Sequence, residues 1–120
     1  MDDVIGLEGP MGPGGDVSPE HATVLAGSGA VLLDVREIDE WEAGHAPGAH
    51  HVPLGQLRAD IIAAGTEVVA VCRSGARSAL AASFLRSKGL VAHNLAGGMQ
   101  AWAASGFPVL RDDGLAGHVA

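Results

Sequence analysis

The sequence predicts a small three-layer α/β domain, with a central parallel sheet of about five short strands flanked by helices on both faces. Residues 30–35 and 68–71 are apolar almost throughout, which is typical of strands covered on both faces. Segments with helical patterns alternate with these runs, as in parallel α/β folds. The chain has 120 residues, which is enough for one such domain and too few for two.

The chain divides into three parts by composition. Residues 1–16 are rich in glycine and proline and predict a flexible leader. Residues 17–110 carry the alternating pattern and form the domain, and residues 111–120 are expected to be a frayed tail.

The first half of the domain alternates regularly. Ser18 followed by proline predicts a helix start, with Val24 and Leu25 on the buried side and an end at residues 27–29. The strand over residues 30–35 comes next. Residues 37–43 predict a short acidic helix, in which Arg36 and Glu40 are spaced to form an ion pair. Ile38 and Trp41 would share one side of that helix.

The second half continues the alternation. Turn residues 44–49 lead into a very short strand at residues 50–52. The apolar positions Leu54, Leu57, Ile61 and Ile62 predict a helix that ends at Gly65. A strand at residues 68–71, a helix at about 76–88, a strand at 91–95 and a helix from residues 97–98 to Gly106 complete the domain.

Charge and targeting signals narrow the class of function. The net charge is −7, but four acids lie in the first sixteen residues, so the domain itself is close to neutral. It has no basic stripe for nucleic acid or for a membrane surface. Residues 1–16 do not resemble a secretion signal, and no stretch is long enough to span a membrane. We therefore expect a cytoplasmic protein with a small-molecule or thiol partner.

The only cysteine, Cys72, stands where the strand at residues 68–71 passes into a helix. At such a junction free backbone N–H groups and the helix dipole favour an anion. Arg73 and Arg77 add positive charge. All three effects lower the pKa of a thiol, and the junction lies at the carboxyl end of the sheet, where ligands of such folds bind. The sequence therefore predicts a nucleophilic cysteine.

Four motifs in register across residues 17–110 resemble the single-domain rhodanese family of sulfurtransferases. They are Leu33-Asp34-Val35-Arg36 with Glu40-Trp41 after it, Gly44-His45-Ala46-Pro47-Gly48-Ala49, Cys72-Arg73-Ser74-Gly75-Ala76-Arg77-Ser78 and Asn94-Leu95-Ala96-Gly97-Gly98-Met99-Gln100-Ala101-Trp102. The resemblance implies a thiosulfate sulfurtransferase in which Cys72 carries the transferred sulfur as a persulfide. It implies no cofactor and no metal. The sequence departs from the family pattern at Ala46 and at His50-His51.

The resemblance and the residue types together assign the remaining site residues. The loop residues Arg73, Ser74, Gly75, Ala76, Arg77 and Ser78 are expected to bind the anionic donor and the persulfide. Asp34 and Arg36 are expected to brace the neighbouring loop through hydrogen bonds. The acceptor would be a small thiol or a thioredoxin-like protein, and the chain would be a monomer or a weak dimer.

Three alternatives remain open from the sequence. A cysteine phosphatase would need a wider loop, typically with five residues between cysteine and arginine, whereas four separate Cys72 from Arg77. A sulfur-carrier module that relays a persulfide between partner proteins would use the same cysteine. Mercaptopyruvate as the donor is less favoured, because its family usually has a less basic loop.

Overall fold

The computed structural model describes residues 14–120 and contains one parallel sheet of five strands in the order β1-β5-β4-β2-β3. Every neighbouring pair is parallel. The predicted α/β class and sheet are therefore confirmed. The strands are β1 (Asp16–Val17), β2 (Val31–Asp34), β3 (His50–His51), β4 (Val68–Val71) and β5 (Ala92–Leu95).

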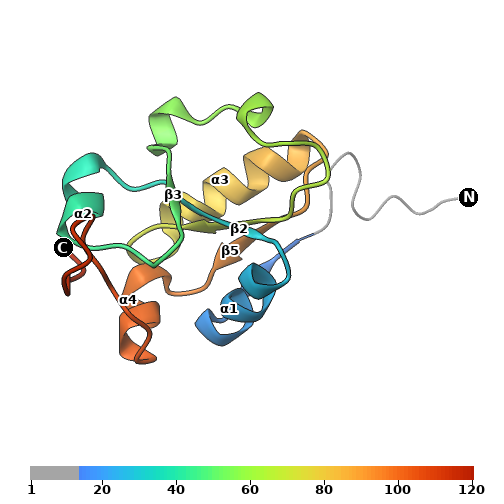
Figure 1. Cartoon of the computed structure of the whole chain (residues 1–120). Helices are drawn as coiled ribbons and strands as arrows, with labels where there is room; N and C mark the ends of the chain where they lie inside the picture. The colour runs from blue at the N-terminus through green and yellow to red at the C-terminus, as the bar shows by residue number, and fades with distance from the viewer. Residues whose placement is uncertain (1–13) are drawn as a thin grey trace, which may run out of the picture.

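Helices cover both faces of the sheet (Figure 1). On one face, α1 (Pro19–Gly27) and α4 (Gly98–Ala104) pack on a core that includes Val69 and Leu95. On the other face, α3 (Ala76–Ser87) packs on Val68 and Ala70. Because successive side chains of a strand point to opposite faces, a strand buried on both sides must be apolar throughout. This explains why every residue of β4, the central strand, is apolar.

The sheet register brings two predicted site segments to one edge. Asp34, the last residue of β2, lies beside Val71, the last residue of β4. Cys72 follows at the carboxyl end of β4, as the sequence predicts. The short helix α2 (Ile38–Ala43) begins four residues after the end of β2 and lies at this same end of the sheet (Figure 1).

Several local predictions are wrong in detail. Residues 54–62 form two short 3₁₀ turns, η1 (Leu54–Gln56) and η2 (Ala59–Ile61), instead of one helix. Arg58 adopts an extended conformation between them, which interrupts any continuous helix. In α1, Pro19 and Ala22 are buried and Leu25 packs against the core as predicted, but Val24 is 65% exposed. In α2, which carries both Ile38 and Trp41, the side chain of Ile38 is 54% exposed.

The sheet extends further toward the N-terminus than the sequence predicts. Asp16 and Val17 pair with Asn94 and Leu95, so the sheet begins inside the predicted leader. Residues 1–13, the rest of that leader, lie outside the described part of the chain.

The C-terminal segment folds back instead of fraying. Leu110 forms antiparallel bridges with both His45 and Ala116, and the amide of His118 donates to the carbonyl of Ala43 at 3.0 Å. This segment, red in Figure 1, therefore lies against α2.

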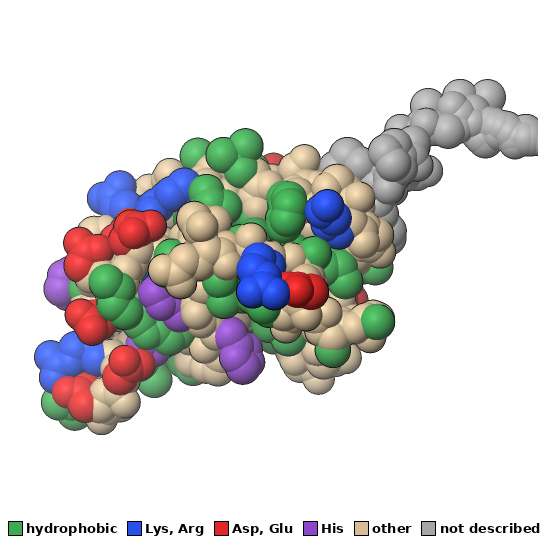
Figure 2. All heavy atoms as spheres, turned by 90° about the horizontal axis from the view of Figure 1, so that it is seen from above, with side chains coloured by type: hydrophobic (Ala, Val, Ile, Leu, Met, Phe, Trp, Pro, Cys, Tyr) green, Lys and Arg blue, Asp and Glu red, His purple; other side chains and the backbone are tan. Residues whose placement is uncertain are grey.

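The surface carries charges of both signs. Figure 2 shows basic and acidic side chains interspersed with apolar ones on one face of the molecule. In the described range 14–120, none of the helices combines the length and the apolar character needed to cross a bilayer.

Candidate active site

The loop that follows β4 surrounds the sulfur of Cys72 with hydrogen-bond donors. The amide of Gly75 donates to Sγ at 3.1 Å, and the Ser78 hydroxyl lies 3.2 Å from it. Gly75 has φ 107°, a left-handed conformation that L-residues other than glycine adopt at a cost. This turn carries the chain into α3, and Cys72 itself is 1% exposed.

These surroundings change the acidity of the thiol. Burial raises the pKa of Cys72, but the Ser78 hydroxyl and the backbone amides of Ser78, Gly75 and Ser74 lower it, and the net shift is downward. Donors stabilise a thiolate more than a neutral thiol, which is the physical cause of the downward contribution. Cys72 is therefore more acidic than an ordinary cysteine and better prepared to act as a nucleophile.

The N-terminus of α4 holds the same loop from outside. The amides of Met99 and Gln100 donate to the carbonyls of Cys72 and Arg73 at 2.8 and 3.0 Å. These amides are free because the first N–H groups of a helix have no partner within it. With its carbonyls held by α4, the loop can turn its own amides toward Sγ.

A glycine permits this close approach. A Cβ atom on Gly98 would overlap the carbonyl oxygen of Cys72 and would lie 2.6 Å from the carbonyl carbon of Arg73. The sequence signal for this contact is the Gly97-Gly98 pair, which the sequence alone explains only as the start of a helix.

Arg77 is paired with an acid from another part of the chain. Its Nη1 and Nη2 donate to the two carboxylate oxygens of Glu40, at 2.7 and 2.9 Å. Hydrogen bonding to Arg77 lowers the pKa of Glu40 to about 2, and the same bond raises the pKa of Arg77. The negative charge of Cys72 also raises the pKa of Arg77, so the guanidinium and the thiolate stabilise each other. The predicted pair of Arg36 with Glu40 is wrong.

Arg73 faces the C-terminal segment. Its Nε donates to the carbonyl oxygen of Ala120 at 2.9 Å. When the side-chain amide of Gln100 is flipped, its oxygen accepts hydrogen bonds from Nη1 and Nη2 of Arg73 at 3.0 and 3.2 Å. The loop therefore places its two arginines on different partners. A role for either in holding a substrate stays a prediction.

Asp34 and Arg36 form a buried pair at the end of β2. The Nη2 of Arg36 donates to Asp34 at 2.8 Å and to the carbonyl of Gly44 at 2.8 Å. The Asp34 carboxylate also accepts from the Nε and the backbone amide of Arg36. This geometry ties the end of the strand to the turn after α2, which is the bracing arrangement that the sequence suggests.

Two residues at the site are not among the site residues that the sequence predicts, although both lie in the motifs of the resemblance. Glu40 lies 37 positions from Arg77, and nothing in the sequence connects them. Asn94, in β5, accepts a hydrogen bond from the Ser78 hydroxyl at 2.5 Å. A signal for Asn94 exists, because an amide within a mostly buried strand needs polar partners. Ser74, on the loop, and Ala76, the first residue of α3, are also predicted as site residues, and both are exposed.

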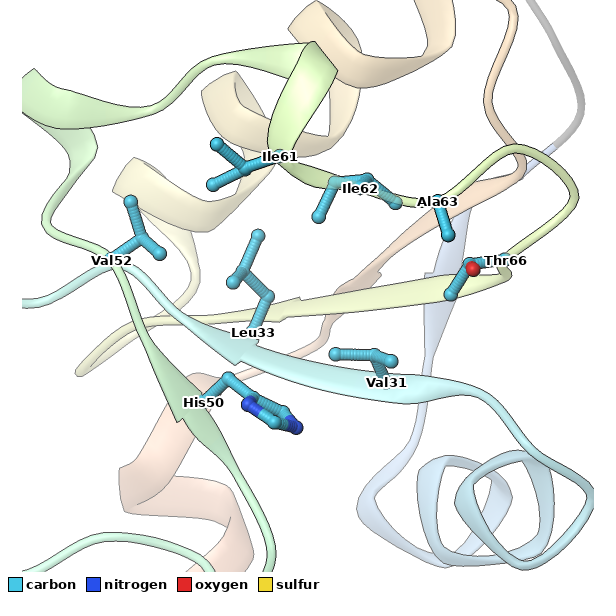
Figure 3. A pocket seen from close by; sticks show the side chains of 8 residues that line it. All are labelled: Val31, Leu33, His50, Val52, Ile61, Ile62, Ala63 and Thr66. Carbon is cyan, nitrogen blue, oxygen red and sulfur yellow. The ribbon is translucent and has the colours of Figure 1, made fainter.

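A separate pocket of about 290 Å³ lies between β2, β3 and η2. Leu33 points toward Ile61 and Ile62 in this pocket, whose lining contains no residue of the Cys72 loop (Figure 3). No group of three histidine, cysteine, aspartate or glutamate side chains within residues 14–120 is placed to hold a metal ion.

Fold and site together define a class of protein. It is a parallel α/β domain with a buried cysteine whose sulfur accepts hydrogen bonds within the loop between the central strand and the following helix. The comparison with family models gives the particular family. The rhodanese-like domain model matches residues 18–105, and this chain belongs to that family.

Known relatives carry sulfurtransferase and sulfur-carrier names. The chain is 37% identical over 89 residues to thiosulfate sulfurtransferase GlpE of Pseudomonas fluorescens, which covers 72% of this chain and 82% of that protein. It is 40% identical over 74 residues to the putative sulfur carrier protein YrkF of Bacillus subtilis, covering 59% of this chain and 40% of that protein. The match thus spans less than half of the YrkF chain.

A solved structure agrees with this assignment. The rhodanese-related protein of Thermoplasma volcanium superimposes with a TM-score of 0.74 at 28% identity. The superposition covers 79% of this chain and 96% of that chain.

Proposed function

We propose that this chain is a sulfurtransferase that takes the outer sulfur of thiosulfate onto Cys72 and passes it to a thiophilic acceptor. The observation that carries the proposal is the donor set around Sγ, with Gly75 at 3.1 Å and Ser78 at 3.2 Å in a loop that lowers the pKa of the thiol. Membership of the rhodanese-like family and the name of the GlpE relative support it.

The chemistry needs only a thiolate and an anion cradle. The thiolate of Cys72 attacks the outer sulfur of thiosulfate, and a new S–S bond forms on the enzyme. The S–S bond of thiosulfate breaks, and its electron pair leaves with sulfite. The resulting persulfide carries its negative charge on the outer sulfur, which the loop amides would stabilise as an oxyanion hole stabilises oxygen. An acceptor such as cyanide then removes that sulfur as thiocyanate and restores the thiolate.

Positive charge is required because thiosulfate is a dianion and approaches another anion. We assign this attraction to Arg77, whose charge already interacts with Cys72. Glu40 holds the guanidinium of Arg77 in place through both Nη groups, so the charge is positioned before substrate arrives. Arg73 would add attraction once it releases the carbonyl of Ala120.

A second candidate is a persulfide relay between proteins. The observation that favours it is the 40% identity with the putative sulfur carrier protein YrkF. The chain has one cysteine, so no second thiol of the same chain can resolve the persulfide, and the acceptor must be external. We propose a small thiol or a thioredoxin-like protein as that acceptor.

Intact mass after incubation with thiosulfate tests the proposal directly. We expect a gain of one sulfur atom that cyanide removes as thiocyanate, and no gain in Cys72→Ser. Persulfide formation only from a protein donor, with slow turnover of thiosulfate, would favour the relay. Hydrolysis of an aryl phosphate without any sulfur adduct would overturn both and identify a phosphatase.

A further inference from the structure

The Ser78 hydroxyl faces two acceptors but carries one proton. Its Oγ lies 3.2 Å from the Sγ of Cys72 and 2.5 Å from the Oδ1 of Asn94. A serine hydroxyl has a single O–H donor and can give it to only one of the two. A thiol sulfur is a weak acceptor and an amide oxygen a good one, so Asn94 receives the proton when Cys72 is neutral.

Asp16 fixes the orientation of the Asn94 amide. The Nδ2 of Asn94 donates to the Oδ1 of Asp16 at 3.1 Å. A carboxylate can only accept, so it holds the amide nitrogen toward itself and turns the amide oxygen toward Ser78. With a neutral thiol, the four side chains form a continuous chain of hydrogen bonds. The S–H of Cys72 donates to Ser78, the hydroxyl of Ser78 donates to Asn94, and the Nδ2 of Asn94 donates to Asp16.

Ionisation of Cys72 disrupts this chain of hydrogen bonds. The thiolate needs a donor, so the Ser78 hydroxyl must turn from Asn94 toward Sγ. The Oδ1 of Asn94 is then left 2.5 Å from an oxygen that offers no proton. The amide can resolve the conflict by flipping, which brings its Nδ2 to Ser78 but turns its Oδ1 toward Asp16. Two acceptors then face each other, which is unfavourable.

We propose that Asn94 is a positioning residue whose amide orientation controls the acidity of Cys72 through Ser78, and that Asp16 holds it in the orientation that favours the neutral thiol. From its place in the edge strand β1, Asp16 therefore limits the ionisation of Cys72. The inference deepens the proposed function, since it concerns the same thiolate. Its test requires no sulfur transfer, so the two proposals can fail separately.

Alkylation of Cys72 with iodoacetamide at several pH values measures the pKa of the thiol. Cys72 is the only cysteine, so the reaction reports on this thiol alone. In Asp16→Asn the new amide can donate to the flipped Asn94, so the cost of ionisation falls. We expect the apparent pKa of the thiol to drop, with about threefold faster alkylation below that pKa, within the range expected for one hydrogen bond.

A second variant should shift the pKa in the opposite direction. In Asn94→Asp the carboxylate accepts the Ser78 proton in either orientation and cannot return one. We expect a higher pKa for the thiol and at least threefold slower alkylation at neutral pH. Thermal unfolding of each variant shows whether the alkylation kinetics are those of a folded protein.

Two controls distinguish an effect passed through the Ser78 hydroxyl from the simple removal of a negative charge. Asp39→Asn removes an exposed carboxylate from α2 and should leave the pKa of the thiol nearly unchanged. In a Ser78→Ala background, Asp16→Asn should no longer change the pKa, because the coupling passes through the hydroxyl. An unchanged pKa in Asp16→Asn alone, or an equal shift with and without Ser78, would overturn the proposal.

Discussion

At the scale of single residues, the site depends on how each charged or polar group is shared. Arg77 is bound to Glu40, Arg73 to the carbonyl of Ala120, and the Ser78 hydroxyl is shared between Sγ and Asn94. The loop alone would suggest two free guanidinium groups beside a thiolate. In the folded protein, each of these groups already has a partner that positions it and limits its effect on the sulfur.

The Glu40 to Arg77 pair predicts a pH-dependent loss of stability. The pKa of Glu40 is about 2 in the folded protein against an ordinary 4.5, so the pair stabilises the fold fully above about pH 4.5 and loses this effect as the pH falls toward 2. Glu40→Gln removes the carboxylate and should lower the free energy of unfolding by about 1 kcal/mol at pH 5, a value discounted for solvent exposure.

Urea unfolding at pH 5 and pH 3 measures this effect. The difference between wild type and Glu40→Gln should fall by about half at pH 3, as linkage requires. Glu42→Gln, at an exposed position of α2, is the matched control and should show little difference at either pH. A difference for Glu40→Gln that grows at pH 3 would contradict the assignment.

At the scale of elements, the site is built by three segments that meet at the carboxyl end of the sheet. β4 delivers Cys72, the start of α3 supplies Ser78, and the start of α4 holds the loop carbonyls through Met99 and Gln100. Helix starts provide free amides wherever they occur, and here two of them act on the same loop from different sides. The cradle is therefore a property of the junction and not of residues 72–78 alone.

Gly98→Ala tests the contribution of α4. The added methyl would overlap the carbonyl oxygen of Cys72, and Gly98 has φ 60°, which disfavours alanine. We expect the loop to shift, the pKa of the thiol to rise toward its ordinary value, and the free energy of unfolding to fall by about 2 kcal/mol.

Alkylation kinetics and thermal unfolding measure the two effects of Gly98→Ala. Gly55→Ala is the control, because a Cβ there meets no atom within 4 Å. If Gly98→Ala destabilised the protein but left the pKa of Cys72 unchanged, α4 would support the fold without organising the cradle.

At the scale of the whole molecule, the C-terminal segment joins parts that are distant in the sequence. His118 and Gly117 donate to the carbonyls of Ala43 and Val109 at 3.0 and 2.8 Å, and the carbonyl of Ala120 accepts from Arg73. The segment thus connects the turn after α2 with the cysteine loop. Its position makes it part of the surroundings of the site.

Gly44→Ala should displace this segment selectively. A Cβ on Gly44 would lie 2.6 Å from Cγ1 of Val109 and 2.7 Å from the amide nitrogen of His118, while the extended φ of 161° causes no backbone strain. The segment lies outside the five-stranded sheet and should move away. We expect about tenfold faster hydrogen exchange at the amides of Gly117 and His118, with β4 unaffected.

Hydrogen exchange followed residue by residue checks this prediction. Gly27→Ala, where a Cβ meets nothing within 4 Å, should leave the pattern unchanged. Equal loss of protection in β4 and in residues 109–118 would show instead that the segment unfolds only with the core.

The sequence by itself determined the sheet, the helices around it and the place of Cys72. Short apolar runs, helix caps and glycine stops are local signals, and residues 68–71 and 76–87 follow them closely. Local patterns failed where a polar or exposed setting allows several conformations, as at residues 54–62 and in the C-terminal segment.

Only the tertiary structure decided which groups act on the sulfur. Glu40 meets Arg77 across 37 positions, and Asp16 meets Asn94 across 78. Such pairs leave no periodic trace in the sequence, because side-chain partners far apart in the chain are selected by how the elements pack. A strand end can place a cysteine where an anion is favoured, but the protonation of that cysteine depends on hydrogen-bond directions that exist only after folding.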